Sequence, residues 1–186
     1  MFEINIITLA IIEFFLLILI FFISKFSKKS WIKESLFNFK IKCKKPLLTI
    51  VLPSILSLIL VLIYSFVFKK IEAYPASLWL LIITAVIIAP LTEEIFLRGI
   101  LLGYVVKMSE YTQTKIGKII FIGIGFIIQL ALFVFLHQRL EWQNLSILIV
   151  SGALYSSLFL IYKKNLLPSI IAHSATNLFV ILFSLL

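Results

Sequence analysis

Three ionisable side chains lie inside a long apolar stretch, where a membrane environment makes charge costly. Glu93, Glu94 and Arg98 fall within residues 78–106, which are otherwise apolar. A charged residue at the centre of a membrane helix costs roughly 2.5–3.5 kcal/mol on insertion scales. On a helix, Glu94 and Arg98 share a face, while Glu93 is turned about 100° away. This spacing favours a function in which Arg98 neutralises Glu94 and leaves Glu93 free for proton transfer. A purely structural Glu94–Arg98 ion pair would fit the same spacing.

The chain has two histidines, and both lie in or beside apolar runs. His137 closes one run, and His173 stands four residues before Asn177 in the last one. Residues four apart share one face of a helix, so His173 and Asn177 could aim two donors at one point. Polar pairs of this kind also hold membrane helices together, which is the structural alternative. Two carboxylates, two imidazoles and an amide nevertheless form the inventory of a hydrolytic site: a base, a residue that orients water, and oxyanion donors.

The composition indicates a membrane protein. Of the 186 residues, 62% are hydrophobic and 13% are charged, and the mean hydropathy is +1.19. These values are far outside the range of soluble globular domains. We therefore predict an all-α fold, a polytopic transmembrane helix bundle of about six spanning helices at ~20 residues each. The apolar runs place these helices at residues 5–24, 46–68, 77–106, 119–137, 145–162 and 166–186.

Two of the predicted spans carry features that bear on helix packing. The third would be about 45 Å long at ~1.5 Å per residue, more than the hydrocarbon core requires. Pro90 stands three residues before Glu93 in this span, so we expect a kink or break there. The fifth span has small residues at a spacing of four, Gly152 and Ser156 among them. We interpret them as a surface for close helix packing rather than as chemistry.

Loop charges predict the orientation in the membrane. Thirteen of the seventeen basic residues lie in three alternate loops, at residues 25–45, 107–118 and 163–164. The positive-inside rule places these loops in the cytoplasm and both termini outside. The net charge of +9 is then explained by attraction to anionic lipid headgroups, and a nucleic-acid partner is not expected. Counted from the cytoplasmic lysines, His137 would lie near the far interface, so on straight helices it would not meet Glu93. A tilt, a break at Pro90 or a fourth helix that begins deeper than Lys118 would close the gap.

The remaining features point to a retained membrane anchor and leave some residues unassigned. The first five residues include a Glu and no Lys or Arg, so the first span lacks the basic region of a cleavable signal peptide. Glu13 in that span could pair with Arg139, a loop lysine or a polar headgroup. Cys43 is the single cysteine, which excludes an intramolecular disulfide, although its basic loop would suit a lipidated thiol. The Ile-, Phe- and Lys-rich composition suggests a bacterial cell membrane.

Three motifs, in this order, resemble those of the CAAX protease and bacteriocin-processing (CPBP) group of intramembrane endopeptidases, also called the Abi family. The motifs are EExxxR, FxxxH and HxxxN, formed here by Glu93, Glu94 and Arg98, by Phe133 and His137, and by His173 and Asn177. The resemblance covers about residues 78–186. It divides the chain into N-terminal membrane helices with a basic cytoplasmic loop, residues 1–76, and a peptidase-like core, residues 77–186.

The resemblance implies a glutamate-dependent peptidase that needs no cofactor. Glu93 and His137 would activate water, and His173 and Asn177 would stabilise the oxyanion. Arg98 would pair with Glu94. In eukaryotic members the substrate is a prenylated CAAX peptide. For a bacterial chain the resemblance favours a leader peptide, a peptide pheromone, a bacteriocin precursor or another small membrane peptide.

Two other functions fit the same residues. In one, the chain is a non-catalytic immunity or binding protein that sequesters a bacteriocin or a membrane protein. In the other, the two histidines and two glutamates bind a divalent metal such as zinc, although the sequence lacks an HExxH motif.

Overall fold

The computed structural model describes residues 46–68, 77–137 and 141–185, together with the isolated positions 11, 15, 18 and 22. The regular elements in these residues are α-helices and π-helices, the latter labelled η. In chain order they are α3 (Pro46–Phe68), α4 (Leu78–Leu81), η1 (Ile82–Ile88), α5 (Ala89–Glu93), η2 (Glu94–Leu102), α6 (Gly103–Ser109), α7 (Lys115–His137), α8 (Trp142–Ile161) and α9 (Leu167–Ser184).

Five helices in this part of the chain are long and apolar enough to cross a membrane. Elements α4 to α6 join without interruption into one helix of 32 residues, Leu78–Ser109, which we call the long helix. With α3, α7, α8 and α9 it makes up the five. The predicted all-α membrane bundle is therefore confirmed. The predicted span 5–24 lies outside the described residues apart from four helical positions, and so do Glu13, Cys43 and Arg139.

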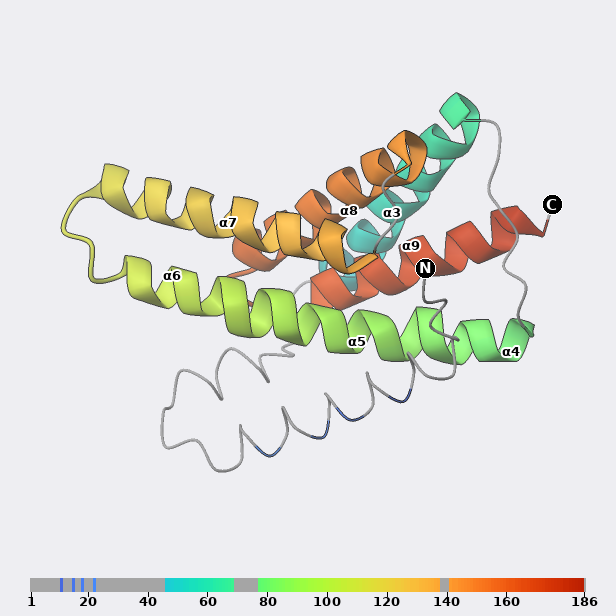
Figure 1. Ribbon diagram of the computed structural model, residues 1–186, viewed down its shortest axis with the longest axis horizontal. Coiled ribbons are helices and arrows are strands. Elements are labelled where there is room, and N and C mark those ends of the chain that lie inside the picture. Colours follow the sequence, from blue (N-terminus) through green and yellow to red (C-terminus); the bar gives the residue numbers. More distant parts are fainter. Residues whose placement is uncertain are drawn as a thin grey trace.

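The long helix and α9 form the centre of the bundle. The chain turns after α6 and returns as α7, which packs along η2 and α6, while α9 packs against α3, α8, η1 and α5 (Figure 1). In the most apolar 18-residue stretch of the long helix, 39% is buried, whereas in that of α7 the buried share is 17%. Two hydrogen bonds to carbonyl oxygens fix α3: Ser57 Oγ donates to Ala172 at 2.7 Å, and Tyr162 Oη donates to Leu48 at 2.7 Å.

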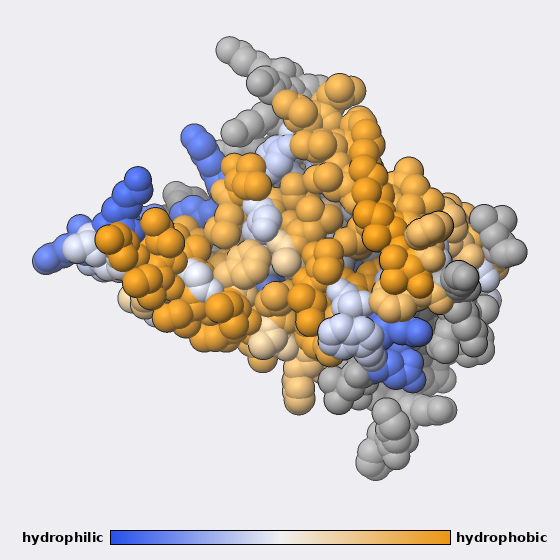
Figure 2. All heavy atoms as spheres, turned by 90° about the horizontal axis from the view of Figure 1, so that it is seen from above, coloured by the Kyte–Doolittle hydropathy of each residue, from blue (hydrophilic) through white to orange (hydrophobic). Residues whose placement is uncertain are grey.

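The outer surface of the bundle is apolar. Figure 2 shows hydrophobic side chains over most of the face in view, with hydrophilic ones gathered toward the edges. Large hydrophobic residues are exposed along the outward faces of the helices, for example Ile63, Ile127 and Phe135. Such a surface suits contact with lipid tails, because lipid tails are as apolar as these side chains.

At Pro90 we expected a kink or a break, and the long helix does not break there. Helical structure continues from Leu78 to Ser109, with π-helical turns on both sides of α5. In the turn before the proline, the N–H of Ala89 donates to the carbonyl of Thr84, five residues back. The wider turn accommodates a residue that cannot donate a backbone hydrogen bond.

Two of the three basic loops meet at one end of the bundle. The turn between α8 and α9 places Lys163 and Lys164 at φ 57° and 63°, a left-handed conformation that reverses the chain in few residues. Lys164 Nζ lies 3.7 Å from Oε1 of Glu110, which follows α6. This proximity agrees with a common membrane side for these loops. The orientation itself stays a prediction, and the third basic loop lies outside the described residues.

Candidate active site

A buried ion pair stands at the centre of the site, where Glu94 begins η2. Arg98 Nη1 donates to Glu94 Oε1 at 2.8 Å, and both side chains have 0% exposure. The pair predicted from the four-residue spacing is therefore formed. Two charges removed from water need further hydrogen bonds to offset their desolvation, and the neighbouring helices provide them.

Helix α8 supplies acceptors for the rest of the guanidinium group. Arg98 Nη2 donates to the carbonyl of Gly152 at 3.1 Å, and Nε donates to Ser156 Oγ at 3.3 Å. Gln129 Nε2, from α7, donates to the same hydroxyl at 2.8 Å. We expected the fifth span to provide only a packing surface, but it also provides hydrogen-bond acceptors for Arg98. Sequence reasoning also missed Gln129, although a lone amide within an apolar run was a signal for it.

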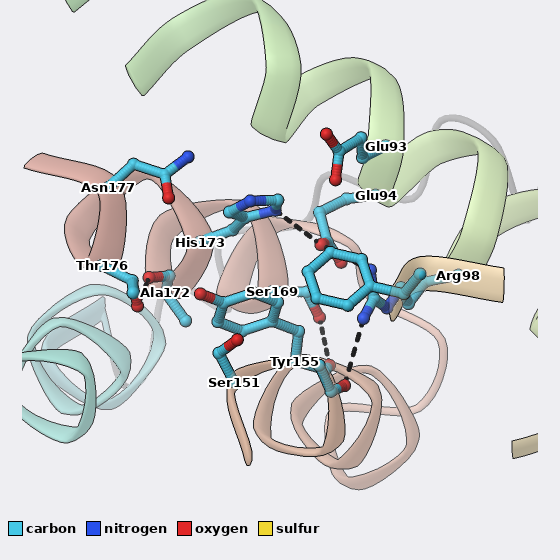
Figure 3. A network of polar contacts seen from close by, with 12 residues as sticks. Glu93, Glu94, Arg98, Ser151, Tyr155, Ser169, Ala172, His173, Thr176 and Asn177 are labelled. Atoms are coloured by element: carbon cyan, nitrogen blue, oxygen red, sulfur yellow. Dashed lines mark hydrogen bonds and ion pairs between the residues drawn. The ribbon is translucent and has the colours of Figure 1, made fainter. Parts of the chain in front are cut away.

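The same glutamate also binds a histidine from the last helix. His173 Nδ1 lies 2.9 Å from Glu94 Oε1, and the imidazole side chain is 3% exposed. Figure 3 shows the ring lying between Asn177 and Glu94. Tyr155 stacks on the imidazole at 4.7 Å between ring centroids and 17° between planes. The backbone of Tyr155 is held in turn by Ser169 Oγ, which donates to the Tyr155 carbonyl at 2.8 Å.

Phe133 completes the aromatic enclosure. Its ring meets His173 edge-on at 5.8 Å, and the Arg98 guanidinium carbon lies 4.8 Å from its centroid. This close approach depends on Gly152, because a Cβ there would lie 2.8 Å from Cδ1 of Phe133 and 2.7 Å from Cδ1 of Leu130. The absent side chain thus lets α7 and α8 pack around the arginine.

Glu93 and His137 form a second, more accessible pair. Oε2 of Glu93 lies 3.8 Å from Nε2 of His137, with side-chain exposures of 21% and 26%. Straight helices counted from the lysines would not bring these two side chains together, but α7 packs against η2 and brings its last residue to Glu93. His137 Nδ1 is 2.8 Å from the carbonyl of Phe133. A carbonyl only accepts, so Nδ1 carries a proton, and Nε2 is the ring nitrogen that faces Glu93.

Asn177 lies one turn beyond His173 on α9 and is also partly buried. Its Nδ2 donates to the carbonyl of Ala85 in η1 at 2.6 Å. Oε2 of Glu93 and Oε2 of Glu94 are buried atoms without a hydrogen-bond partner in the described residues. The structure thus brings all six predicted side chains into one polar cluster, in which carboxylate oxygens with unused acceptor capacity lie beside two imidazoles.

The described residues contain no group of three or more His, Cys, Asp or Glu side chains that could hold a metal ion. Oε1 of Glu94 already accepts from Arg98 and contacts His173.

Comparison with known protein families gave a match. The family model of the type II CAAX prenyl endopeptidase Rce1-like proteins matches residues 75–179. The chain belongs to this family. No curated protein and no solved structure matches the chain significantly. The predicted membership of the CAAX protease group is thereby confirmed, and all six cluster residues lie within the matched range.

Membership of the Rce1-like family identifies the chain as a CAAX-type membrane protease at the level of the family. The five helices suited to a membrane agree with a multi-pass protein.

Proposed function

We propose that the chain is a glutamate-dependent intramembrane endopeptidase in which Glu93 and His137 activate a water molecule. One observation carries this proposal: Glu93 Oε2 and His137 Nε2 face each other at 3.8 Å. Two acceptors at this distance are too far apart for a direct hydrogen bond but can share the hydrogens of one water. The oxygen of that water would attack the peptide carbonyl as its proton passes to the Glu93 carboxylate. That proton would then reach the departing amine as the C–N bond breaks.

His173 and Asn177 would stabilise the oxyanion formed by this attack. Nδ1 of His173 donates to Glu94, since an ionised carboxylate only accepts. From Nε2, the doubly protonated ring would donate to the oxyanion. Asn177 would contribute an amide hydrogen. Arg98 would hold Glu94, and through it His173, in place without contacting the substrate.

The substrate class that fits is a peptide or a small membrane protein. Glu93 lies at the middle of the 32-residue long helix, about 24 Å from either end at ~1.5 Å per residue. A scissile bond would therefore have to enter the membrane region to reach it. We propose residues 77–186 as the peptidase core, with α3 supporting α9 from outside. We place the protein in a bacterial cell membrane.

The test is cleavage of a quenched peptide library by the purified protein in lipid nanodiscs. Glu93→Gln and His137→Gln should each lose about 100-fold or more in turnover, because general acid–base catalysis typically contributes 10²–10⁴-fold. Glu110→Gln is the matched control, since it removes an exposed carboxylate outside the cluster. Its turnover should equal that of the wild type.

Full turnover by the Glu93→Gln protein would refute the proposal. Activity that disappears with a chelator and returns with zinc would instead support a metal centre. Capture of a bacteriocin or membrane protein that survives Glu93→Gln, without any cleavage, would support the immunity or binding function.

A further inference from the structure

The carbonyl group of Ala85 lacks its usual backbone partner. In an α-helix it would accept from the N–H four residues ahead, and in a π-helix from the N–H five residues ahead. The first donor belongs to Ala89, whose N–H donates to Thr84 instead. The second position is Pro90, which has no N–H. The π-helical register and the proline together remove both donors.

A side chain from α9 supplies the missing donor. Asn177 Nδ2 donates to the Ala85 carbonyl at 2.6 Å, across 92 positions of the sequence. Both residues are half-buried, and an unpaired carbonyl in such a place costs free energy. The bond therefore has a cause in the backbone of the long helix and does not depend on the side-chain conformation of Asn177 alone.

We infer that Pro90 is a positioning residue of the active site. By withdrawing a backbone donor, it leaves the Ala85 carbonyl as a fixed acceptor that holds the Asn177 amide beside His173. An amide nitrogen carries two hydrogens. With one directed at Ala85, the amide plane is set and the second hydrogen has a defined direction. The functional consequence rests on the proposed function, in which Asn177 stabilises the oxyanion.

If this inference is right, replacing Pro90 should lower turnover without lowering the stability of the protein. Alanine is a far better helix residue than proline, so Pro90→Ala should leave the protein at least as stable as the wild type. Residue 90 would then have an N–H, and in either helical register the Ala85 carbonyl would regain a backbone donor. Asn177 would lose its anchor. A proline that served only the fold would not give higher stability together with lower turnover.

The first measurement is steady-state cleavage in nanodiscs, using a peptide selected from the quenched library. For Pro90→Ala we expect kcat to fall by about 10- to 100-fold with KM within about twofold, because small misplacements of catalytic groups cost this much. Adding Asn177→Ala should cause no further loss. Pro53→Ala is the matched control, because Pro53 lies inside α3, a helix that contributes none of the six cluster residues, and its kcat should be unchanged.

The second measurement observes the Ala85 carbonyl directly. Ala85-Val86 is the one Ala-Val pair in the sequence, so labelling alanine with ¹³C at the carbonyl and valine with ¹⁵N gives a single doubly labelled peptide bond in solid-state NMR. Asn177→Ala should move the Ala85 carbonyl resonance upfield, as expected when a hydrogen bond is lost. In the Pro90→Ala background the same substitution should leave the resonance in place.

Two results would overturn the inference. One is an Ala85 resonance that does not respond to Asn177→Ala in the wild-type background, which needs no proline variant to be folded. The other is a folded Pro90→Ala protein with wild-type kcat. If the wild type cleaves no peptide while the resonance behaves as expected, the proposed function fails and the anchoring of Asn177 by Pro90 stands.

Discussion

Nδ1 of His173 lies 2.9 Å from Oε1 of Glu94, the same oxygen that accepts the hydrogen bond of Arg98 at 2.8 Å. Glu94 therefore joins an arginine on its own helix to a histidine on α9. Because it contacts both, a change at Glu94 affects the charge balance of the buried core and the orientation of the imidazole together.

Glu94→Gln should destabilise the protein strongly. The substitution keeps the size of the side chain but leaves Arg98 buried without a counter-charge, and an uncompensated buried charge costs about 3–5 kcal/mol. The free energy of unfolding, measured in mixed micelles by denaturant titration, should fall by this amount. Glu94→Gln combined with Arg98→Met removes both charges and should recover part of the loss. A double variant less stable than Glu94→Gln would contradict this account.

Gly152→Ala should destabilise the helix packing around Arg98. The added Cβ would lie 2.7 Å from Cδ1 of Leu130 and 2.8 Å from Cδ1 of Phe133, so these side chains must move, at a cost of about 1–3 kcal/mol for an overpacked core. The matched control is Gly123→Ala in α7, where no atom lies within 4 Å of the added Cβ. That variant should gain up to about 1 kcal/mol in helix propensity. Equal melting temperatures for the two alanine variants would exclude the steric explanation.

Glu110 should make a small, pH-dependent contribution to stability. The hydrogen bond from Lys107 lowers the pKa of the Glu110 carboxyl below its usual value, desolvation opposes this shift, and the charges of Lys107 and Lys164 add to it. The stabilisation is therefore complete above the ordinary Glu pKa and is lost as pH falls through the lowered one.

The measurement is the melting temperature of wild type and Glu110→Gln between pH 3 and pH 7, since the ordinary Glu pKa is 4.5. We expect the wild type to be more stable at neutral pH by a few tenths of a kcal/mol, as for other exposed ion pairs. The difference should vanish at the acidic end and shrink in 1 M salt. A difference that persisted unchanged at low pH would show that Glu110 acts through packing.

The positions of the helices could be predicted from hydropathy and charge. Span 46–68 coincides with α3 (Pro46–Phe68), and the other described spans agree with their helices to within a few residues. The Glu94–Arg98 pair was also predictable, because residues four apart on one helix are neighbours whatever the tertiary structure. Both properties depend on short windows of sequence.

The contacts between helices were decided by the tertiary structure. The distance between Glu93 and His137 depends on how α7 packs against η2, and a depth count from flanking lysines along straight helices does not contain this packing. The stacking of Tyr155 on His173 depends on how α8 packs against α9, and the bond from Asn177 to Ala85 depends on the π-helical turn before Pro90. The sequence by itself determined which residues form the helices and which of them carry the motifs. Tertiary packing decided which of these residues meet, because side-chain volumes and unpaired backbone groups act across helices that are distant in the chain.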